Sequence, residues 1–488
     1  MVPVKSIIQI DRDSQQAVFL QIANALIREI KRGRIRPGTR LPGTRNLADS
    51  LEIHRNTAVS AYDELAAQGW TETRASKGTF VKTCLPDLSP HPLKTDQMDK
   101  PEMVPESGYE ISELPFEPRS SPDIPAGFLA LNDGSPDVRL TPVSALAKAY
   151  RRVMHRGLKL SYGDEAGDIH TRKVFADYLN ETRGLQAKPE NLLITRGSQM
   201  ALYLAIMAVV DAGEHVVMAE QSYHSVEHVF NWAGAVIHRV PIDDKGIDVN
   251  ALEKLCQRTQ IKAIYVVPHH QYPTTVSLVP QRRMKLLDMA KKYGFAIIED
   301  DHDFDFHYKS SPILPLASSD YRGQVIYTGS FSKTIAPSFR IGFMTAPNNI
   351  IQKARKIRRI VDRQGDQILE KALAELIQEG EVRRHLRKTL NIYNKRRNIF
   401  CRLLREKLSD YLHFNIPDGG MALWLQFDTP LNPDRFCGEL EDEGIFLSPD
   451  NLYEMTNGKY AVRIGFASLN EEEIEQTVEA FAEVLKTM

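Results

Sequence analysis

A proline-rich segment divides this chain of 488 residues into two parts of very different length. Residues 84–126 hold nine prolines among Ser, Asp, Glu and Lys, and their apolar residues follow no regular period. Proline fixes a backbone torsion and removes a hydrogen-bond donor, so such a segment cannot form a packed core and behaves as a semi-extended spacer. The sequence therefore predicts a small module over residues 1–83, a linker over residues 84–126 and a large body over residues 127–488.

Charge is unevenly distributed between these parts. The whole chain carries a formal net charge of −1, but residues 1–83 contain 13 Lys and Arg against 8 Asp and Glu, a net of +5. A basic module on a slightly acidic body indicates a polyanionic partner for the module alone. The four cysteines form no CxxC pair, so neither a disulfide framework nor a metal site is predicted. No signal-peptide core or membrane-length apolar run occurs, and we expect a cytoplasmic protein with no membrane partner.

The small module has the pattern of a winged helix-turn-helix. Helical spacing of apolar residues covers residues 18–30, and two shorter helical stretches follow at 44–50 and 55–68. Residues 69–74 and 77–81 then indicate a two-stranded hairpin.

In such a module the start of the second helix-turn-helix helix lies nearest the bases, and neighbouring basic groups reach phosphate or the minor groove. Arg can bond guanine and Asn adenine in bidentate fashion. The alternative is a structural winged helix that makes protein contacts. The predicted DNA contacts are Arg45, His54, Arg55, Asn56, Thr57, Lys77 and Gly78.

The body alternates apolar strands with helical segments, which predicts an α/β domain with a mostly parallel sheet. The strand candidates are residues 191–195, 215–219, 263–267, 295–299 and 324–328. From about residue 390 a helix, a strand at 419–424 and a final helix at 470–487 indicate a small C-terminal α+β subdomain.

Lys333 follows the strand at 324–328 directly and is framed by small hydroxyl residues. Lysine is the usual side chain for Schiff-base chemistry with pyridoxal phosphate. Ser330, Ser332 and Arg340 would hold the phosphate of that cofactor. A solvated lysine in a turn is the ordinary alternative, but the rest of the body supplies the other parts of a pyridoxal phosphate site.

Those other parts follow three more strands. Asp300 closes the strand at 295–299 and would pair with the pyridine nitrogen. Ser198 and Gln199 open an apolar helix, whose free N–H groups suit a phosphate. Tyr223 is the candidate for stacking on the ring, with a buried core tyrosine as the alternative.

Residues 33–42 (GRIRPGTRLP), 45–48 (RNLA) and 55–65 (RNTAVSAYDEL) make the module resemble the GntR family of bacterial regulators. The resemblance covers residues 14–82 and implies DNA binding as a dimer on paired half-sites of an operator. It assigns the DNA-contacting role to the residues named above. Val59 stands where some relatives have a DNA-contacting arginine.

The body resembles aminotransferases of fold type I, and the whole chain resembles a MocR/GabR-type regulator. The matching motifs are residues 134–137 (GSPD), 162–167 (YGDEAG), 270–274 (HQYPT), 299–301 (EDD), 329–342, 419–420 (GG) and 463–466 (RIGF). The resemblance implies a head-to-tail homodimer in which Tyr162 approaches the phosphate across the interface. It also implies that Arg463 holds the carboxylate of an effector, and that His302 stands where the family usually has a tyrosine near the phenolic oxygen of the cofactor.

Two functions follow from these expectations. The first is a transcription regulator that senses pyridoxal phosphate, with or without an amino-compound effector. The second is an active pyridoxal phosphate-dependent aminotransferase that carries a DNA-binding module. Both need Lys333 and Asp300, and they differ in whether catalysis completes. The linker and the DNA-binding module favour regulation, since a shared fold does not establish turnover.

Overall fold

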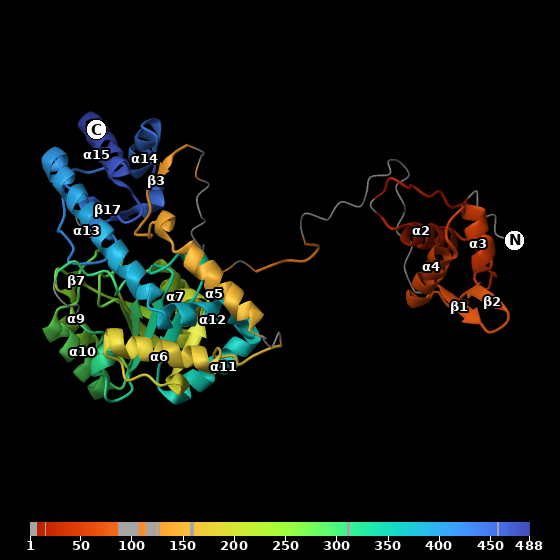
Figure 1. The fold of residues 1–488 in the computed structure, drawn as a ribbon, viewed down its shortest axis with the longest axis horizontal. Coiled ribbons are helices and arrows are strands. Elements are labelled where there is room, and N and C mark those ends of the chain that lie inside the picture. Colours follow the sequence, from red (N-terminus) through yellow and green to blue (C-terminus); the bar gives the residue numbers. More distant parts are fainter. Residues whose placement is uncertain are drawn as a thin grey trace. The chain divides into compact units, whose positions relative to one another are not determined.

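The computed structural model describes residues 7–14, 16–85, 107–112, 114, 124, 127–156, 161–309, 313–455 and 458–488. The chain forms two compact units, Met1–Ile111 and Ser112–Met488, and each is described by itself (Figure 1). Most of the linker predicted over residues 84–126 lies outside the described residues. The boundaries at residues 83 and 126 therefore stay predictions.

The N-terminal unit is a winged helix-turn-helix, as the sequence predicts. Its elements are α2 (Val18–Lys31), α3 (Thr44–Leu51), α4 (Arg55–Ala67) and the antiparallel hairpin of β1 (Thr71–Arg74) and β2 (Gly78–Val81). The three helices and the hairpin share one core, in which Ile22, Leu47 and Leu65 are fully buried. The side chain of His54 caps α4, because its Nδ1 accepts the backbone N–H of Asn56 at 3.3 Å.

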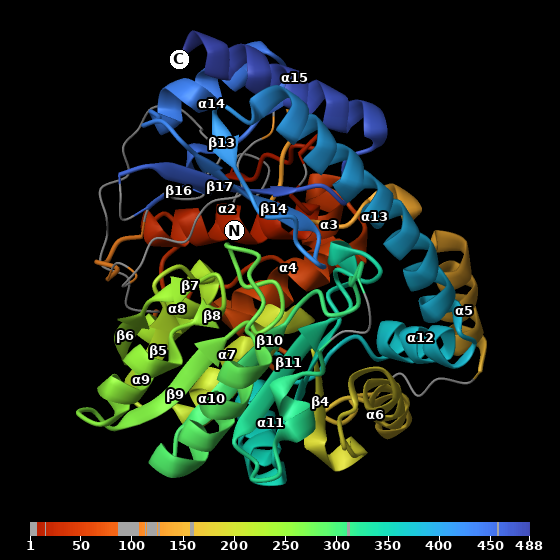
Figure 2. The same ribbon diagram turned by 90° about the vertical axis from the view of Figure 1, so that its left-hand side faces the viewer.

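A seven-stranded sheet forms the centre of the body (Figure 2). Its order is β4 (Leu192–Thr195), β12 (Gly342–Thr345), β11 (Val325–Ser330), β10 (Ala296–Asp301), β9 (Ile261–Val266), β5 (His215–Ala219) and β6 (Val236–Val240). Only β12 runs antiparallel to its neighbours in this sheet. The prediction of a mostly parallel sheet is confirmed.

Helices cover both faces of this sheet, which is why its strands are almost continuously apolar. Val216 and Met218 pack in one core with α7 (Gly197–Val209), α8 (His224–Trp232) and α11 (Asn348–Val361). Val217 and Ala219, which alternate with them, pack against α9 (Val249–Cys256) and α10 (Pro280–Tyr293). The β4 end is covered on this second face by α5 (Val143–His155), α6 (Ile169–Arg183) and α12 (Gln367–Gln378).

The small domain is an antiparallel sheet under three helices. The sheet order is β13 (Leu412–His413), β14 (Ala422–Phe427), β17 (Tyr460–Gly465) and β16 (Leu452–Glu454), and the helices are α13 (Glu381–Leu408), α14 (Pro433–Asp442) and α15 (Glu471–Thr487). Two details differ from the prediction. Helix α13 begins at Glu381, before residue 390, and β3 (Leu129–Ala130) pairs with β15 (Ile445–Phe446), so the start of the body belongs to this domain too.

Within the described ranges, no helix is both long and apolar enough to cross a membrane.

Candidate functional site

The carboxyl ends of four parallel strands meet above the sheet and bring the predicted cofactor residues together. Ligands in open α/β sheets bind at this edge. Here it encloses a cavity of about 190 Å³. The cavity is lined by Asp133, Gly134, Ser198, Tyr223, Tyr265, Tyr272, Asp300, His302, Lys333 and Arg463.

Lys333 lies just beyond β11, and its Nζ donates a hydrogen bond to the carbonyl oxygen of Gly134 at 2.8 Å. Burial lowers the pKa of this amine, and the negative charge of Asp133 only partly opposes the shift. A lowered pKa leaves more of the amine neutral, and the neutral amine is the nucleophile. The site therefore suits Lys333 to attack an aldehyde.

Asp300 is fully inside the protein at the end of β10. Its Oδ2 accepts a hydrogen bond from the hydroxyl of Tyr265 at 2.9 Å, and Thr328 Oγ1 lies 3.4 Å from its Oδ1. Burial raises the pKa of the Asp300 carboxyl, although the charge of His302 opposes the shift. A buried carboxylate is stabilised by a cation, and a protonated pyridine nitrogen is one that the cavity could hold.

A cradle for an anion lies at the start of α7. Gly197, its first residue, has a φ of +77°, and a Cβ added there would lie 2.8 Å from the guanidinium of Arg340. Arg340 donates to the carbonyl oxygen of Arg196 at 3.1 Å. The Ser332 hydroxyl is buried and has no hydrogen-bond partner among the described residues. Free helical N–H groups, a guanidinium and a spare hydroxyl fit a phosphate.

Ser330 positions the backbone of this cradle through two hydrogen bonds. Its Oγ donates to the carbonyl oxygen of Ile341 at 3.2 Å and accepts the backbone N–H of Ser332 at 3.0 Å. Ser198 lines the cavity at the first turn of α7, whereas Gln199 lines an adjoining hollow.

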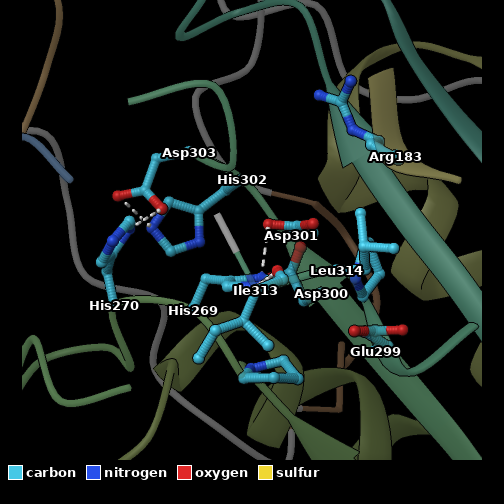
Figure 3. A network of polar contacts seen from close by, with 12 residues as sticks. Arg183, His269, His270, Glu299, Asp300, Asp301, His302, Asp303, Ile313 and Leu314 are labelled. Carbon is cyan, nitrogen blue, oxygen red and sulfur yellow. Dashed lines mark hydrogen bonds and ion pairs between the residues drawn. The ribbon is translucent and has the colours of Figure 1, made fainter. Parts of the chain in front are cut away.

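His302 is linked to the protein interior through an aspartate (Figure 3). Its Nε2 lies 3.5 Å from Oδ2 of Asp303, and Oδ1 of Asp303 lies 2.8 Å from Nδ1 of His270. Burial would raise the pKa of the Asp303 carboxyl, but His302 and His270 outweigh it and hold that pKa well below the usual range. An ionised carboxylate thus anchors the histidine that faces the cavity.

Tyr162, another predicted cofactor residue, lies at neither the cavity nor the phosphate cradle in the single chain. The residue is 73% exposed, and the guanidinium of Arg363 lies 4.1 Å from the ring centroid. It lines a separate hollow with residues of α12. This position leaves the predicted contact across a dimer interface as a prediction.

Four residues of the cavity lining were given no role from the sequence: Asp133, Gly134, Tyr265 and Tyr272. Tyr265 looks like an ordinary core residue of β9, and Asp133 lies 200 residues before Lys333 with no motif of its own. Gly134 and Tyr272 lie inside quoted motifs that carried no assigned role for them. These side chains are far apart in the sequence and meet only in the folded domain, so no local pattern predicts their position.

The predicted DNA contacts occupy the exposed starts of two helices and the tip of the hairpin. Arg45 lies in the first turn of α3, and His54, Arg55 and Asn56 begin α4 with exposed side chains. Thr57 is half-buried, Lys77 is exposed, and Gly78 has a φ of +105°. Arg40, to which no role was assigned, lies beside the wing, with its Nε 3.2 Å from where a Cβ of Gly78 would be.

Comparison with known proteins agrees with this geometry. Residues 127–481 match the family of class I and II aminotransferases, and residues 19–81 match the gntR family of bacterial regulatory proteins. The chain is 30% identical to the probable rhizopine catabolism regulatory protein MocR of Rhizobium meliloti, over 90% of this chain and 88% of the relative.

Solved structures match the body. An archaeal alanine:glyoxylate aminotransferase is 30% identical with a TM-score of 0.69, over 74% of this chain and 91% of that one. The α-aminoadipate aminotransferase LysN of Thermus thermophilus, complexed with N-(5'-phosphopyridoxyl)-L-leucine, is 25% identical with a TM-score of 0.68, over 74% of this chain and 93% of that one.

These matches define a class of regulators that join a DNA-reading module to an aminotransferase-like body. The chain belongs to the aminotransferase class I and II family through its body and to the gntR family through its N-terminal unit, the combination found in MocR/GabR-type regulators. It is a DNA-binding transcription regulator, and its cofactor is pyridoxal phosphate.

Proposed function

We propose that this chain senses pyridoxal phosphate, alone or together with an amino-compound effector, and thereby sets its affinity for a double-stranded DNA operator. The observation that carries the proposal is that Lys333, Asp300 and Ser198 line one cavity, and that the phosphate cradle lies at the start of α7, the helix that carries Ser198, in a chain with an exposed recognition helix.

Each residue around the cavity would contact a different part of the cofactor. Bound pyridoxal phosphate supplies an aldehyde that an amine can attack and a ring that withdraws electrons. Lys333 would attach to the aldehyde through Nζ, and Asp300 would hold a proton on the ring nitrogen. Tyr223 would pack on the ring, with His302 at its oxygen. The phosphate would be held by Ser198, Gln199, Ser332 and Arg340, while Ser330, predicted to hold it too, would position the Ser332 backbone.

A change in the cavity can reach the DNA only if it shifts an equilibrium between two arrangements of the protein. We propose a head-to-tail homodimer for this purpose, with Tyr162 directed toward the partner's cofactor. Its support is the exposed position of Tyr162, away from the cavity of its own chain. The protein would work in the cytoplasm, where the DNA of its bacterial relatives lies.

Cofactor attachment can be measured directly by absorbance. Adding pyridoxal phosphate to the purified chain should produce a visible band that Lys333→Ala abolishes. Lys173→Ala, at an exposed lysine of α6, is the matched control and should keep the band. A wild-type chain without the band would refute the sensor and leave a DNA-binding protein that ignores the cofactor.

The alternative of an active aminotransferase is not favoured, because the full-length relative is a regulatory protein. Multiple-turnover transfer of an amino group from any donor to a keto acid would nevertheless establish it.

A further inference from the structure

His302 and Asp303 are consecutive residues after β10 that lie in different surroundings. His302 lines the cavity of about 190 Å³, whereas the side chain of Asp303 is only 1% exposed. A hydrogen bond of 2.8 Å joins Oδ1 of Asp303 to Nδ1 of His270. The other oxygen, Oδ2, lies 3.5 Å from Nε2 of His302 (Figure 3). One buried carboxylate is thus shared by two imidazole rings, and one of these rings faces the cofactor cavity.

A glycine pair of the small domain packs on Asp303 and His270. Gly420 has a φ of +76°, and a Cβ added there would lie 3.0 Å from Oδ2 of Asp303. A Cβ at Gly419 would overlap Nε2 of His270. The backbone N–H of Gly420 donates to the carbonyl oxygen of Phe306 at 2.7 Å, which fixes this close approach. The carboxylate is therefore enclosed, and a charge in such surroundings acts more strongly on its neighbours than one in water.

One oxygen of this carboxylate has no hydrogen bond. Oδ2 of Asp303 is buried without a hydrogen-bond partner among the described residues, although Nε2 of His302 lies 3.5 Å away. An unpaired buried carboxylate oxygen costs free energy, and a donated N–H relieves that cost. His302 is placed to supply the donor, and a charged donor makes the stronger bond.

The two nitrogens of His302 can both donate hydrogen bonds only in a charged ring. A neutral imidazole carries one N–H, whereas the imidazolium carries two. If Nε2 donates to Asp303, the ring oxygen of pyridoxal phosphate can receive an N–H from Nδ1 only when the ring is a cation. A carboxylate close by favours that charged form. His302 would then bring a positive charge to the place where the family usually has a tyrosine.

The remaining titratable groups of the cavity lining do not replace Asp303 in this role. The two cations, Lys333 and Arg463, are offset in formal charge by Asp133 and Asp300. Asp300 would itself pair with the ring nitrogen of the cofactor. Burial raises the pKa values of three phenols, which therefore stay neutral: Tyr223, Tyr265 and Tyr272.

We propose that Asp303 is a positioning residue that holds His302 as a cation, with one N–H turned to the carboxylate and the other toward the ring oxygen of pyridoxal phosphate. The inference rests on the proposed function, because it concerns the same cofactor cavity. A cation beside the ring oxygen favours the ionised form of that oxygen. The bound cofactor should therefore change its ionisation at a lower pH than it would beside a neutral side chain.

The absorbance of the full-length chain loaded with pyridoxal phosphate, recorded as a function of pH, tests the proposal. Asp303→Asn keeps the shape of the side chain and removes its charge. Because His302 then loses its positive charge, the pH midpoint of the cofactor band should rise by about one unit. The loss of a nearby negative charge would by itself lower that midpoint, so the direction of the shift separates the two effects. A midpoint that stays or falls in Asp303→Asn would overturn the proposal.

His302→Gln keeps a donor N–H but removes the positive charge, so it should raise the midpoint by a similar amount. In the His302→Gln background, Asp303→Asn should add no further rise, and a further rise would show that Asp303 does not act through His302. Asp288→Asn, at an exposed aspartate of α10, is the control and should leave the midpoint unchanged.

Two further outcomes are decided by the same measurement. Where Asp303→Asn fails to fold, an unchanged midpoint in His302→Gln overturns the proposal, and a raised one supports it. A wild-type chain that shows no cofactor band fails the proposed function instead, which separates that failure from a failure of the role of Asp303.

Discussion

His269, His270, His302 and His307 lie close to Asp301 and Asp303 near the cofactor cavity, and their contacts shift the pKa values of Asp303 and His307 strongly. Asp303 is held ionised between His270 and His302. His307, by contrast, packs edge-on to His269 and beside His270, and burial together with those two rings lowers its pKa to about 3. Asp301 and Asp303 oppose that shift without reversing it.

Replacing His307 should therefore change how stability depends on pH. The unfolded chain binds a proton on this ring below its ordinary pKa of 6.5, whereas the folded chain does so only near 3. Stability is thus lost as the pH falls from about 6.5 toward 3, by about 2 kcal/mol at a pH of about 5.

His307→Gln should remove that loss, and denaturant unfolding at two pH values measures it. His170→Gln, at an exposed histidine of α6, is the control and should behave as the wild type. If His307→Gln lost stability on acidification as steeply as the wild type, the burial argument would be wrong.

Individual site residues differ in whether the sequence around them predicts their role. Lys333 and Asp300 follow strands and have neighbours of the right chemistry, so a short window was enough to propose them. Asp133 reaches the cavity because β3 joins the small domain and returns the chain beside Arg463. That contact spans 330 residues, and no local pattern encodes it.

At the scale of elements, the start of α7 is built around a residue without a side chain. Gly197 and Gly213 both have positive φ angles, of +77° and +83°, but a Cβ at Gly197 would press on Arg340 while one at Gly213 meets open space. Alanine should strain the backbone at either position by about 1 kcal/mol.

Only Gly197→Ala should weaken cofactor binding, by at least about tenfold, because it displaces a charged phosphate donor. Absorbance titration with pyridoxal phosphate compares the two variants. Equal losses of affinity in both would show that the cradle depends on general stability and not on the space at Gly197.

The recognition helix and the wing should contribute differently to DNA binding. Arg55→Ala, at the start of α4, should cost about 1–3 kcal/mol and relax the base preference, whereas Lys77→Ala should weaken all sequences alike and reduce the salt slope by about 1. Gln68→Ala, at the far end of α4, is the control. Fluorescence anisotropy on a selected duplex at several salt concentrations measures all three, and a wing variant that changed base preference would contradict this division.

The sequence predicts the presence of long helices and strands better than their exact ends. All five predicted strands of the large domain are present, because each is a buried apolar run between turn residues. The early start of α13 was not predicted because Val382 is the only apolar residue in Glu381–Arg384, and a single apolar residue shows no helical spacing. Strand β3 was not predicted because two residues are too few to show the alternation of apolar and polar side chains that marks a strand.

At the scale of the whole molecule, the central claim is that the cofactor cavity controls the DNA-binding module. Coupling free energies between two sites of one protein amount to about 1–3 kcal/mol, or about five- to 150-fold in affinity. Such coupling requires an intact chain, since the cavity and the recognition helix belong to different compact units.

The most direct test is the affinity of the full-length chain for a duplex selected with it from random sequence, measured with and without pyridoxal phosphate. We predict a change of at least about fivefold, which Lys333→Ala removes and Lys173→Ala keeps. Unchanged affinity in a wild-type chain whose absorbance proves that the cofactor is bound would contradict the account.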